Sequence, residues 1–313
     1  MAALALGVAP NVRAESYPDR PIRIIYNFAP GGPGDAIVRF LAQRVSDIVG
    51  QSIIVQNISG GAGSVGILSA ARSDADGHTL LFAVLTGILQ VPFVTGNESF
   101  DPFASLVPVA NTGSAPLALL ARSDVPANDI PSFIEWARQQ EQGVNVGGAG
   151  AIVELATAVL ASRTDTKLVW VGYRGVAPAL QATLAGDVDI LFIPPVGALD
   201  GYLSRGDLKV LGVTSTEASP LFPGAEPILT HVPNYSQEID YALWAPAGVP
   251  QARLATLNKA LREVMAQPDV GEFLQANGVV ARYQDSEQLT KVLKQQDTAI
   301  REALEVTGVR LGG

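Results

Sequence analysis

The sequence predicts an α/β protein of two lobes, each built on a mostly parallel sheet flanked by helices. Strand and helix patterns alternate along nearly the whole chain, which is typical of parallel sheets covered by helices. The length of 313 residues exceeds that of one small domain and favours two lobes of ordinary size. A strand, a glycine turn and a helix follow one another at Gly31-Gly32 and again at Gly147-Gly148, far enough apart for one of these turns to lie in each lobe.

Each predicted element follows from the spacing of its apolar residues. Residues 22–27 are a short, largely apolar stretch that contains Ile22, Ile24 and Ile25, which predicts a strand. Residues 35–49 predict a helix, because apolar residues recur every three or four positions and so share one face; they are Ile37, Leu41, Val45 and Ile48. We then expect a strand at 52–58, a glycine turn at 59–66 with a short helix ending near 73, strands at 80–84, beyond 100–110 and at 116–122, and a helix at 130–140.

The second half of the chain repeats the order of the first. Residues 144–162 contain a strand, a glycine turn and a helix. After them we expect a strand at 168–171, a helix at 176–186, strands at 188–193 and 208–214, a proline-rich connector at 219–235, a strand at 240–246, and helices to the end of the chain.

Composition excludes several classes of function. The net charge of -9 disfavours nucleic acid and acidic membrane surfaces as partners. The absence of cysteine excludes thiol catalysis, thiolate metal sites and disulfides. The two histidines, His78 and His231, stand in a turn and in a connector, so the sequence predicts no metal site and no catalytic triad. With 30 acidic residues, a carboxylate pair for acid–base hydrolysis stays open, but no motif indicates one.

Residues 1–14 differ from the rest of the chain. They are small and apolar, and Val12-Arg13-Ala14 resembles a signal cleavage site. The stretch has no positively charged start and is too short to span a bilayer. We interpret it as the remnant of an export signal, with the mature chain starting near Glu15; the alternative is an ordinary frayed terminus.

One segment matches a nucleotide-binding pattern. Gly61-Ala62-Gly63-Ser64-Val65-Gly66 is a G-x-G-x-x-G between a strand and a helix. A dinucleotide site also needs an acidic residue at the end of the next strand, and "TLLFAV" carries none. No glycine turn has the lysine and hydroxyl of a phosphate-binding loop, and no G-x-S-x-G or H-E-x-x-H is present. We therefore predict no cofactor and no catalytic residue.

The two glycine turns, which lack lysine, are the remaining candidates for a site. A helix start offers amide donors without partners and a partial positive charge, and glycine lets an anion approach the backbone closely. Without lysine, such a cradle suits a singly charged carboxylate better than a polyphosphate. The alternative is that both are only tight turns between a strand and a helix.

The order of several motifs resembles a known family. These are "YPDRPIRII", "FAPGGPGDAIVRFLAQRVSDIVGQSIIVQNISGGAGSVG", "ARSDADGHTLLFA", "FDPFASLVPVA", "VGYRGVAPALQATLAGDVDILF" and "LWAPAGVP". Together they resemble the Bug-type extracytoplasmic solute receptors of tripartite tricarboxylate transporters. The resemblance extends from Tyr17 to about Val309, with the motifs in the order of the family.

The resemblance implies a Venus-flytrap fold of the type II-like periplasmic binding proteins. Residues 15–113 with 240–313 would form lobe 1, and 114–239 would form lobe 2. In this family two loops hold the ligand's proximal carboxylate through backbone amides and ordered water, and they match 28–35 and 147–151 here. The predicted ligand-binding residues are Phe28, Pro30, Gly31, Gly32, Gly34, Asp35, Thr86, Gly147, Gly148, Ala149, Gly150, Ala151, Ile193, Pro194 and Tyr241.

Departures from the family pattern indicate an apolar ligand. The second loop lacks the hydroxyl side chains common in the family, and Ile193 and Pro194 stand where an aspartate and an asparagine are often found. Thr86 lies in an expected loop after residue 84, where Leu85 and Ile88 would add apolar surface. We therefore expect an aromatic or medium-chain mono- or dicarboxylate, held so closely that bulk at Gly148 weakens binding.

The resemblance thus predicts a periplasmic binding protein rather than an enzyme. It would act as a monomer, capture a small organic carboxylate and deliver it to membrane subunits of a tripartite tricarboxylate-type transporter. Two alternatives stay open. The protein can instead report its ligand to a two-component sensor kinase, or it can be an enzyme on a similar fold.

Overall fold

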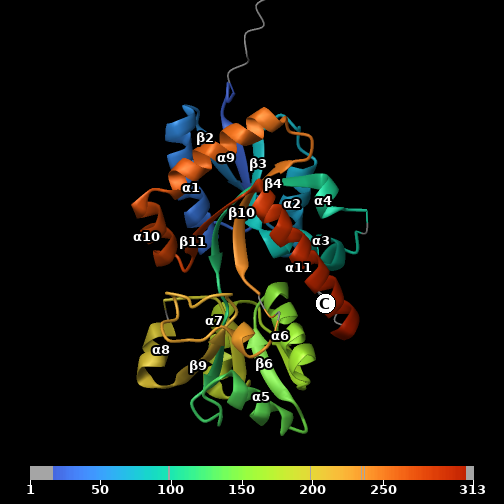
Figure 1. Cartoon of the computed structure of the whole chain (residues 1–313), viewed down its shortest axis with the longest axis vertical. Coiled ribbons are helices and arrows are strands. Elements are labelled where there is room, and N and C mark those ends of the chain that lie inside the picture. Colours follow the sequence, from blue (N-terminus) through green and yellow to red (C-terminus); the bar gives the residue numbers. More distant parts are fainter. Residues whose placement is uncertain (1–16, 98, 198, 234, 236, 308–313) are drawn as a thin grey trace, which may run out of the picture.

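A computed structural model of the chain describes residues 17–97, 99–197, 199–233, 235 and 237–307. The predicted two-lobed α/β architecture is confirmed. A six-stranded and a five-stranded sheet lie one beyond the other along the longest axis of the molecule, and helices flank each of them (Figure 1). The predicted export signal at 1–14 lies outside the described residues.

The first sheet combines strands from both ends of the chain. Its strands are β1 (Ile22–Tyr26), β2 (Ile53–Asn57), β3 (Thr79–Val84), β4 (Leu106–Ala115), β10 (Ile239–Pro246) and β11 (Val280–Asp285). Their order across the sheet is β11-β4-β10-β3-β1-β2. β1 pairs in parallel with β2 and β3, and its Ile22 and Ile25 are fully buried.

The second sheet is formed by the middle of the chain. Its strands are β5 (Ala118–Arg122), β6 (Val144–Gly148), β7 (Leu168–Gly172), β8 (Ile190–Ile193) and β9 (Leu208–Val213). Their order is β7-β6-β8-β5-β9. The chain enters this sheet between β4 and β5 and leaves it between β9 and β10, so two crossovers join the lobes.

Both sheets are mixed, which corrects the expectation of mostly parallel sheets. β10 is antiparallel to both neighbours, β3 and β4, because it carries the chain back from the second lobe. β5 is antiparallel to β8 and β9, because it leads the chain away from the first lobe. The parallel parts, β2-β1-β3 and β7-β6-β8, are the ones that the alternation of strand and helix predicted.

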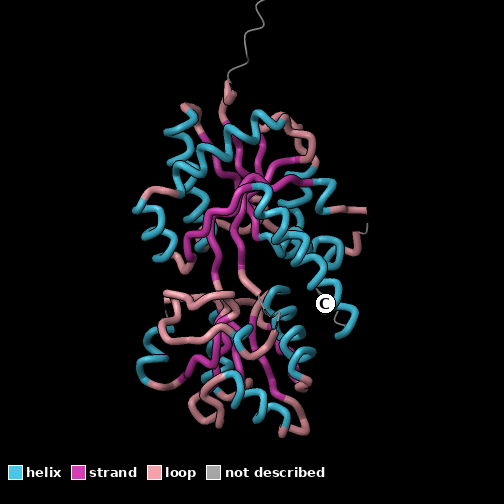
Figure 2. Tube along the Cα trace, viewed as in Figure 1, coloured by secondary structure: helices cyan, strands magenta, loops and turns pink. Residues whose placement is uncertain are grey.

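Helices lie around the strands in both lobes (Figure 2). They are α1 (Pro33–Val49), α2 (Ser64–Ala71), α3 (Leu85–Thr95), α4 (Pro102–Ser105), α5 (Ile130–Arg138), α6 (Ala151–Thr164), α7 (Val176–Ala185), α8 (Leu199–Arg205), α9 (Gln251–Met265), α10 (Pro268–Ala276) and α11 (Ser286–Thr307), with 3-10 turns η1 (Gly61–Gly63) and η2 (Ile228–Thr230). Among the described residues, no helix combines the length and the apolar character that crossing a membrane requires.

α1 shows how the local sequence sets the ends and the buried face of a helix. Most of the predicted stripe, including Ile37 and Leu41, is buried, whereas Ile48 is 39% exposed. Pro33 fits at the first position, because the first amides of a helix have no partner inside it. Gly50 ends the helix with a φ of 71°, a conformation that glycine adopts without strain.

Three elements differ from what the sequence pattern predicts. α3 begins at Leu85, directly after β3, in a segment expected to be a loop. α8 follows β8, and β11 interrupts the helices expected at the end of the chain. The pairing of β11 with β4 shifts between Ala281 and Gln284, and this irregularity hides the alternation of a regular strand.

The last helix contacts both lobes. α11 packs against β4 in the first lobe and against α6 in the second. Figure 1 shows it running beside the gap between the two sheets, with its end next to α6. The lobes are therefore joined by two crossovers and by a packed helix.

β10 presents different residues to its two faces. Ile239 and Tyr241 line a cavity between the lobes, whereas the intervening Asp240 and the preceding Glu238 are buried, with 3% and 5% exposure. Arg282 of β11 donates a hydrogen bond to Glu238 Oε2 at 2.8 Å. Burial raises the pKa of both carboxyl groups. The nearby hydrogen-bond donors and the charge of Arg282 lower it by less, so both pKa values stay above the usual range. The start of β10 and the residue before it thus carry two buried acidic side chains.

We expect Asp240→Asn to raise the free energy of unfolding at about pH 8 by about 1 kcal/mol. Asparagine keeps an oxygen for the Ser114 hydroxyl, and the buried Gln296 Oε1, which has no partner, can accept from the new amide once that side chain turns. Because the folded-state pKa is raised, the wild type loses stability as the pH rises above the ordinary aspartate pKa of about 4.

Urea unfolding at several pH values measures this difference. The gain should vanish below about pH 3, where the carboxyl group is protonated in both the folded and the unfolded state, and should grow toward neutral pH. A gain of the same size at every pH would contradict the explanation by buried charge.

Candidate functional site

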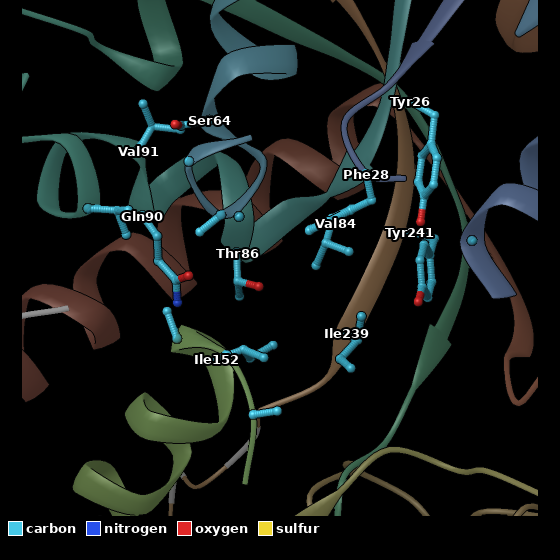
Figure 3. A pocket seen from close by; sticks show the side chains of 18 of the residues that line it. Tyr26, Phe28, Ser64, Val84, Thr86, Gln90, Val91, Ile152, Ile239 and Tyr241 are labelled. Carbon is cyan, nitrogen blue, oxygen red and sulfur yellow. The ribbon is translucent and has the colours of Figure 1, made fainter. Parts of the chain in front are cut away.

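A cavity of about 420 Å³ lies between the lobes. The first lobe contributes the ends of β1 and β3, part of β10, η1, the starts of α1 and α2 and one face of α3, and the second lobe contributes the start of α6. Figure 3 shows side chains from these elements pointing toward a common space. Residues from both lobes therefore form one site.

The helices that start at this cavity lack side-chain caps. α1 follows Gly32, α2 follows Gly63, α3 follows Val84 and α6 follows Gly150, and none of these four residues forms a capping hydrogen bond through its side chain. The first amides of a helix have no partner within it, and the helix dipole adds a partial positive charge there. At α2 the first two amides already donate to the preceding turn, Ser64 N–H to Gly61 O and Val65 N–H to Gly60 O. The starts of α1, α3 and α6 thus border the cavity with backbone donors that favour an anion.

Glycine leaves the backbone of the two predicted loops uncovered by side chains. Gly31 has a φ of 96° and Gly150 a φ of 86°, in the left-handed region where other residues are strained. A Cβ atom placed on Gly31, Gly32 or Gly150 would meet no heavy atom within 4 Å. The backbone of both loops is therefore accessible to a ligand.

Asp35 holds the first loop rather than lining the cavity. Its carboxylate accepts hydrogen bonds from the Gly31 amide at 3.1 Å, from Arg39 at 3.1 Å and from Asn57 at 2.9 Å. Burial alone would raise its pKa, but these donors and the charge of Arg39 lower the pKa below its usual value. The side chain is ionised and fully occupied, so its role is to fix the turn before α1.

Two tyrosines stand on one side of the cavity. In Figure 3 the Tyr26 hydroxyl points toward Tyr241, and both rings line the space. Burial raises the pKa of Tyr241 to about 12 and raises the pKa of Tyr26 as well. A Cβ atom at Gly34 would lie 2.2 Å from the Tyr26 hydroxyl oxygen, so glycine is required for this arrangement. Both phenols stay neutral at physiological pH and can donate hydrogen bonds.

The other walls of the cavity are mostly apolar. Val84, Val91, Val94, Ile152 and Ile239 contribute aliphatic surface. Among the described residues, no charged side chain lines the cavity. The geometry suits a ligand with a small anionic end for the backbone amides and an apolar body.

A larger hollow of about 700 Å³ lies behind β10, against α11. Its charged side chains include Glu238 and Arg282, which already pair with each other at 2.8 Å. The cavity between the lobes is the better candidate, because its polar backbone groups are left open.

The structure brings part of the predicted site together. The predicted residues that line the cavity are Phe28, Gly34, Thr86, Ala149, Gly150, Ala151 and Tyr241. Pro30, Gly31, Gly32 and Asp35 belong to the first loop but do not line the cavity, and Gly147 and Gly148 end β6 behind the second loop. Ile193 is 1% exposed in the core of the second lobe, and the adjacent Pro194 does not line the cavity either. That these residues contact a ligand remains a prediction.

Gly148 has a packing role, which corrects the expectation that bulk there would block the ligand. A Cβ atom at this position would lie 2.4 Å from Val153 and 2.9 Å from Trp170. A valine would therefore disrupt the contact between β6 and α6 before it affected any ligand. A substitution that tests the site must instead point into the cavity.

Comparison with known proteins identifies the family. The sequence model described as "Tripartite tricarboxylate transporter family receptor" matches residues 37–308. The chain belongs to this family. It is 31% identical to a UPF0065 protein of Bordetella pertussis, over 93% of this chain and 90% of that protein. It is also 31% identical to BugT of Bordetella pertussis, over 87% of this chain and 84% of that protein.

Solved structures agree with this assignment. The periplasmic binding protein BugD superposes with a TM-score of 0.73 at 26% identity, covering 94% of this chain and 99% of that chain. MatC from Rhodopseudomonas palustris, solved with bound malate, has a TM-score of 0.70 at 26% identity, covering 93% and 100%. A Rhodopseudomonas palustris protein solved with adipate shares the fold, with a TM-score of 0.76 at 23% identity, covering 94% and 99%.

For this family member, sequence reasoning placed Thr86 at the site but missed the rest of the cavity-lining face of α3. Gly87, Gln90, Val91 and Val94 line it, and their spacing of three, four and seven positions places them on one face of a helix. The opposite face carries Leu85 and Ile88, which are fully buried in the core and so do not enlarge the apolar pocket as expected. The spacing of Gly87, Gln90, Val91 and Val94 was the sequence signal that could have predicted this helix and its cavity-lining face.

Metal and histidine chemistry is not indicated at this site. Among the described residues, no group of three or more histidine, cysteine, aspartate or glutamate side chains is placed to hold a metal ion. His78 packs edge-on against Tyr17, with ring centroids 5.1 Å apart, and His231 pairs with Glu226 at 3.0 Å. Neither residue lines the cavity.

Proposed function

We propose that this protein is a periplasmic solute-binding protein that captures a small organic carboxylate and delivers it to a tripartite tricarboxylate-type membrane transporter. The observation that carries the proposal is the convergence of the starts of α1, α3 and α6, which lack side-chain caps, from both lobes on one otherwise apolar cavity. Family membership and the malate-bound relative support a carboxylate as the ligand class.

The cavity favours binding over catalysis. Its hydroxyl groups come from Tyr26, Ser64, Thr86 and Tyr241, and no carboxylate or imidazole among the described lining residues stands beside them to act as a base. Burial of an apolar body contributes roughly 25 cal/mol per Å². Together with amide contacts to the carboxylate, this supports affinities on the order of micromolar.

We expect hexanoate, benzoate and adipate to bind at least about tenfold more tightly than glutamate or citrate. An ammonium group would be buried without an anionic partner, and citrate brings more negative charge than neutral donors can offset. Isothermal titration calorimetry on the full chain measures the affinities. Tightest binding by glutamate or citrate would contradict this ligand class, and no heat with any of the five acids would contradict the carboxylate site.

Delivery to a transporter is tested separately from binding. Cells that carry the membrane subunits should take up the bound acid only when this protein is present. If cells that lack this protein lost the transcriptional response to the acid but kept the same uptake, the sensor-kinase alternative would be favoured.

A further inference from the structure

Gln90 carries an unused hydrogen-bond donor in the cavity. The residue lies on α3 and is 6% exposed. Its Nε2 is buried and has no hydrogen-bond partner, and it is the only such side-chain nitrogen or oxygen among the described residues that line the cavity. In Figure 3 the Gln90 amide points into the cavity, on the side away from Tyr26 and Tyr241.

A buried amide without a partner is costly. Leaving a buried donor unsatisfied costs about 1–3 kcal/mol, and native proteins contain few such groups. The core side of α3 offers Gln90 no alternative, because Leu85, Ile88 and Leu89 fill it with apolar contacts. The donor is therefore placed where a molecule inside the cavity can satisfy it.

We propose that Gln90 donates a hydrogen bond to a second oxygen of the ligand, remote from the carboxylate that the starts of α1 and α6 hold. This inference rests on the proposed function and narrows it. The ligand would be a carboxylate with a carbonyl or second carboxylate oxygen at its far end, separated by an apolar middle that contacts Val84, Ile152 and Ile239.

The surroundings of Gln90 fit an oxygen acceptor. Its Nε2 can only donate, and the hydroxyls of Thr86 and Ser64, which also line the cavity, can donate as well. α2 and α3 both start at this cavity without a side-chain cap, so their dipoles favour negative charge. A ligand amine at this end would find no anionic partner among the described lining residues.

Three acids of similar length separate the contribution of the far oxygen. Hexanoate ends in a methyl group, 6-oxoheptanoate in a neutral ketone and adipate in a second carboxylate. With the wild-type chain we expect adipate and 6-oxoheptanoate to bind about tenfold more tightly than hexanoate. Gln90→Met, which keeps the length of the side chain and removes the donor, should lose this preference and bind hexanoate as well as before.

Two further variants are measured with the same three acids. Gln90→Glu replaces the donor by a carboxylate and should weaken adipate more than 6-oxoheptanoate, because like charges repel. Gln275→Met on α10, where the side chain is exposed, is the matched control and should change no affinity. Melting temperatures of all variants show whether they fold.

The outcomes distinguish the role of Gln90 from the proposed carboxylate-binding function. Equal binding of all three acids by the wild type, or the same preference in Gln90→Met, would overturn the role of Gln90 and leave the carboxylate site standing. If none of the three acids bound, both the proposed function and this inference would be overturned.

Discussion

Gly87→Leu is expected to reduce carboxylate affinity by at least about 100-fold while the protein becomes slightly more stable. Gly87 is the third residue of α3 and lines the cavity, and a Cβ atom there would meet nothing within 4 Å. A leucine side chain therefore grows into the space of about 420 Å³ that the ligand needs, without clashing with the protein. Leucine also favours the helix over glycine by roughly 0.8 kcal/mol.

Gly271→Leu is the matched control for this experiment. Gly271 also lies inside a helix, α10, does not line the cavity, and has no heavy atom within 4 Å of the position that a Cβ atom would take. Both variants should melt at or above the wild-type temperature, but only Gly87→Leu should lose heat in titrations with hexanoate, benzoate and adipate. Unchanged affinity in Gly87→Leu would place the ligand outside this cavity.

The fold could be predicted to a large extent because its signals are local. The stripe that includes Ile37 and Leu41, the branched run of β1 and the two strand-turn-helix units each depend on spacing within about fifteen residues. The direction of β10 and β5 in their sheets depends on where the chain crosses between lobes, which is set by contacts far apart in sequence. The spacing of apolar residues within one element carries no information on strand direction, so the sequence did not predict that the sheets are mixed.

The candidate site was predicted at the two glycine loops, at Thr86 and at Tyr241, and it was missed along the rest of α3. Gly150 and Ala151 were found because a glycine turn before a helix leaves a visible pattern. Gln90 and Val94 were missed because β3 passes directly into α3 without a glycine turn or a capping side chain. Ile193 was placed by family position, but the structure directs its side chain to the core.

The start of α6 is the second lobe's part of the proposed carboxylate-binding site. This helix start is the second lobe's contribution to the lining of the cavity, and all other described lining elements belong to the first lobe. A carboxylate that bridges α1 and α6 would thus hold the lobes together. Removing a single donor from α6 should weaken binding without disturbing either core.

Ala151→Pro is the substitution that removes such a donor. Ala151 is the first residue of α6, and its amide has no backbone partner among the described residues. Proline is tolerated at this position, as Pro33 shows at the start of α1, and Gly150 has a ψ of 157°, which suits a residue before proline. The variant should therefore fold like the wild type.

We expect Ala151→Pro to weaken binding of hexanoate, benzoate and adipate about 10- to 100-fold, because a hydrogen bond to a charged group contributes about 1.5–3 kcal/mol. Ala151→Ser keeps the amide and should lose much less affinity than Ala151→Pro. Ser286→Pro makes the same change at the first residue of α11, away from the cavity, and controls for the effect of proline on a helix start. Calorimetry gives the affinities and thermal melting gives the stabilities. If Ala151→Pro melts like the wild type and binds all three acids equally well, the start of α6 does not hold the carboxylate, and the grip belongs to the first lobe alone.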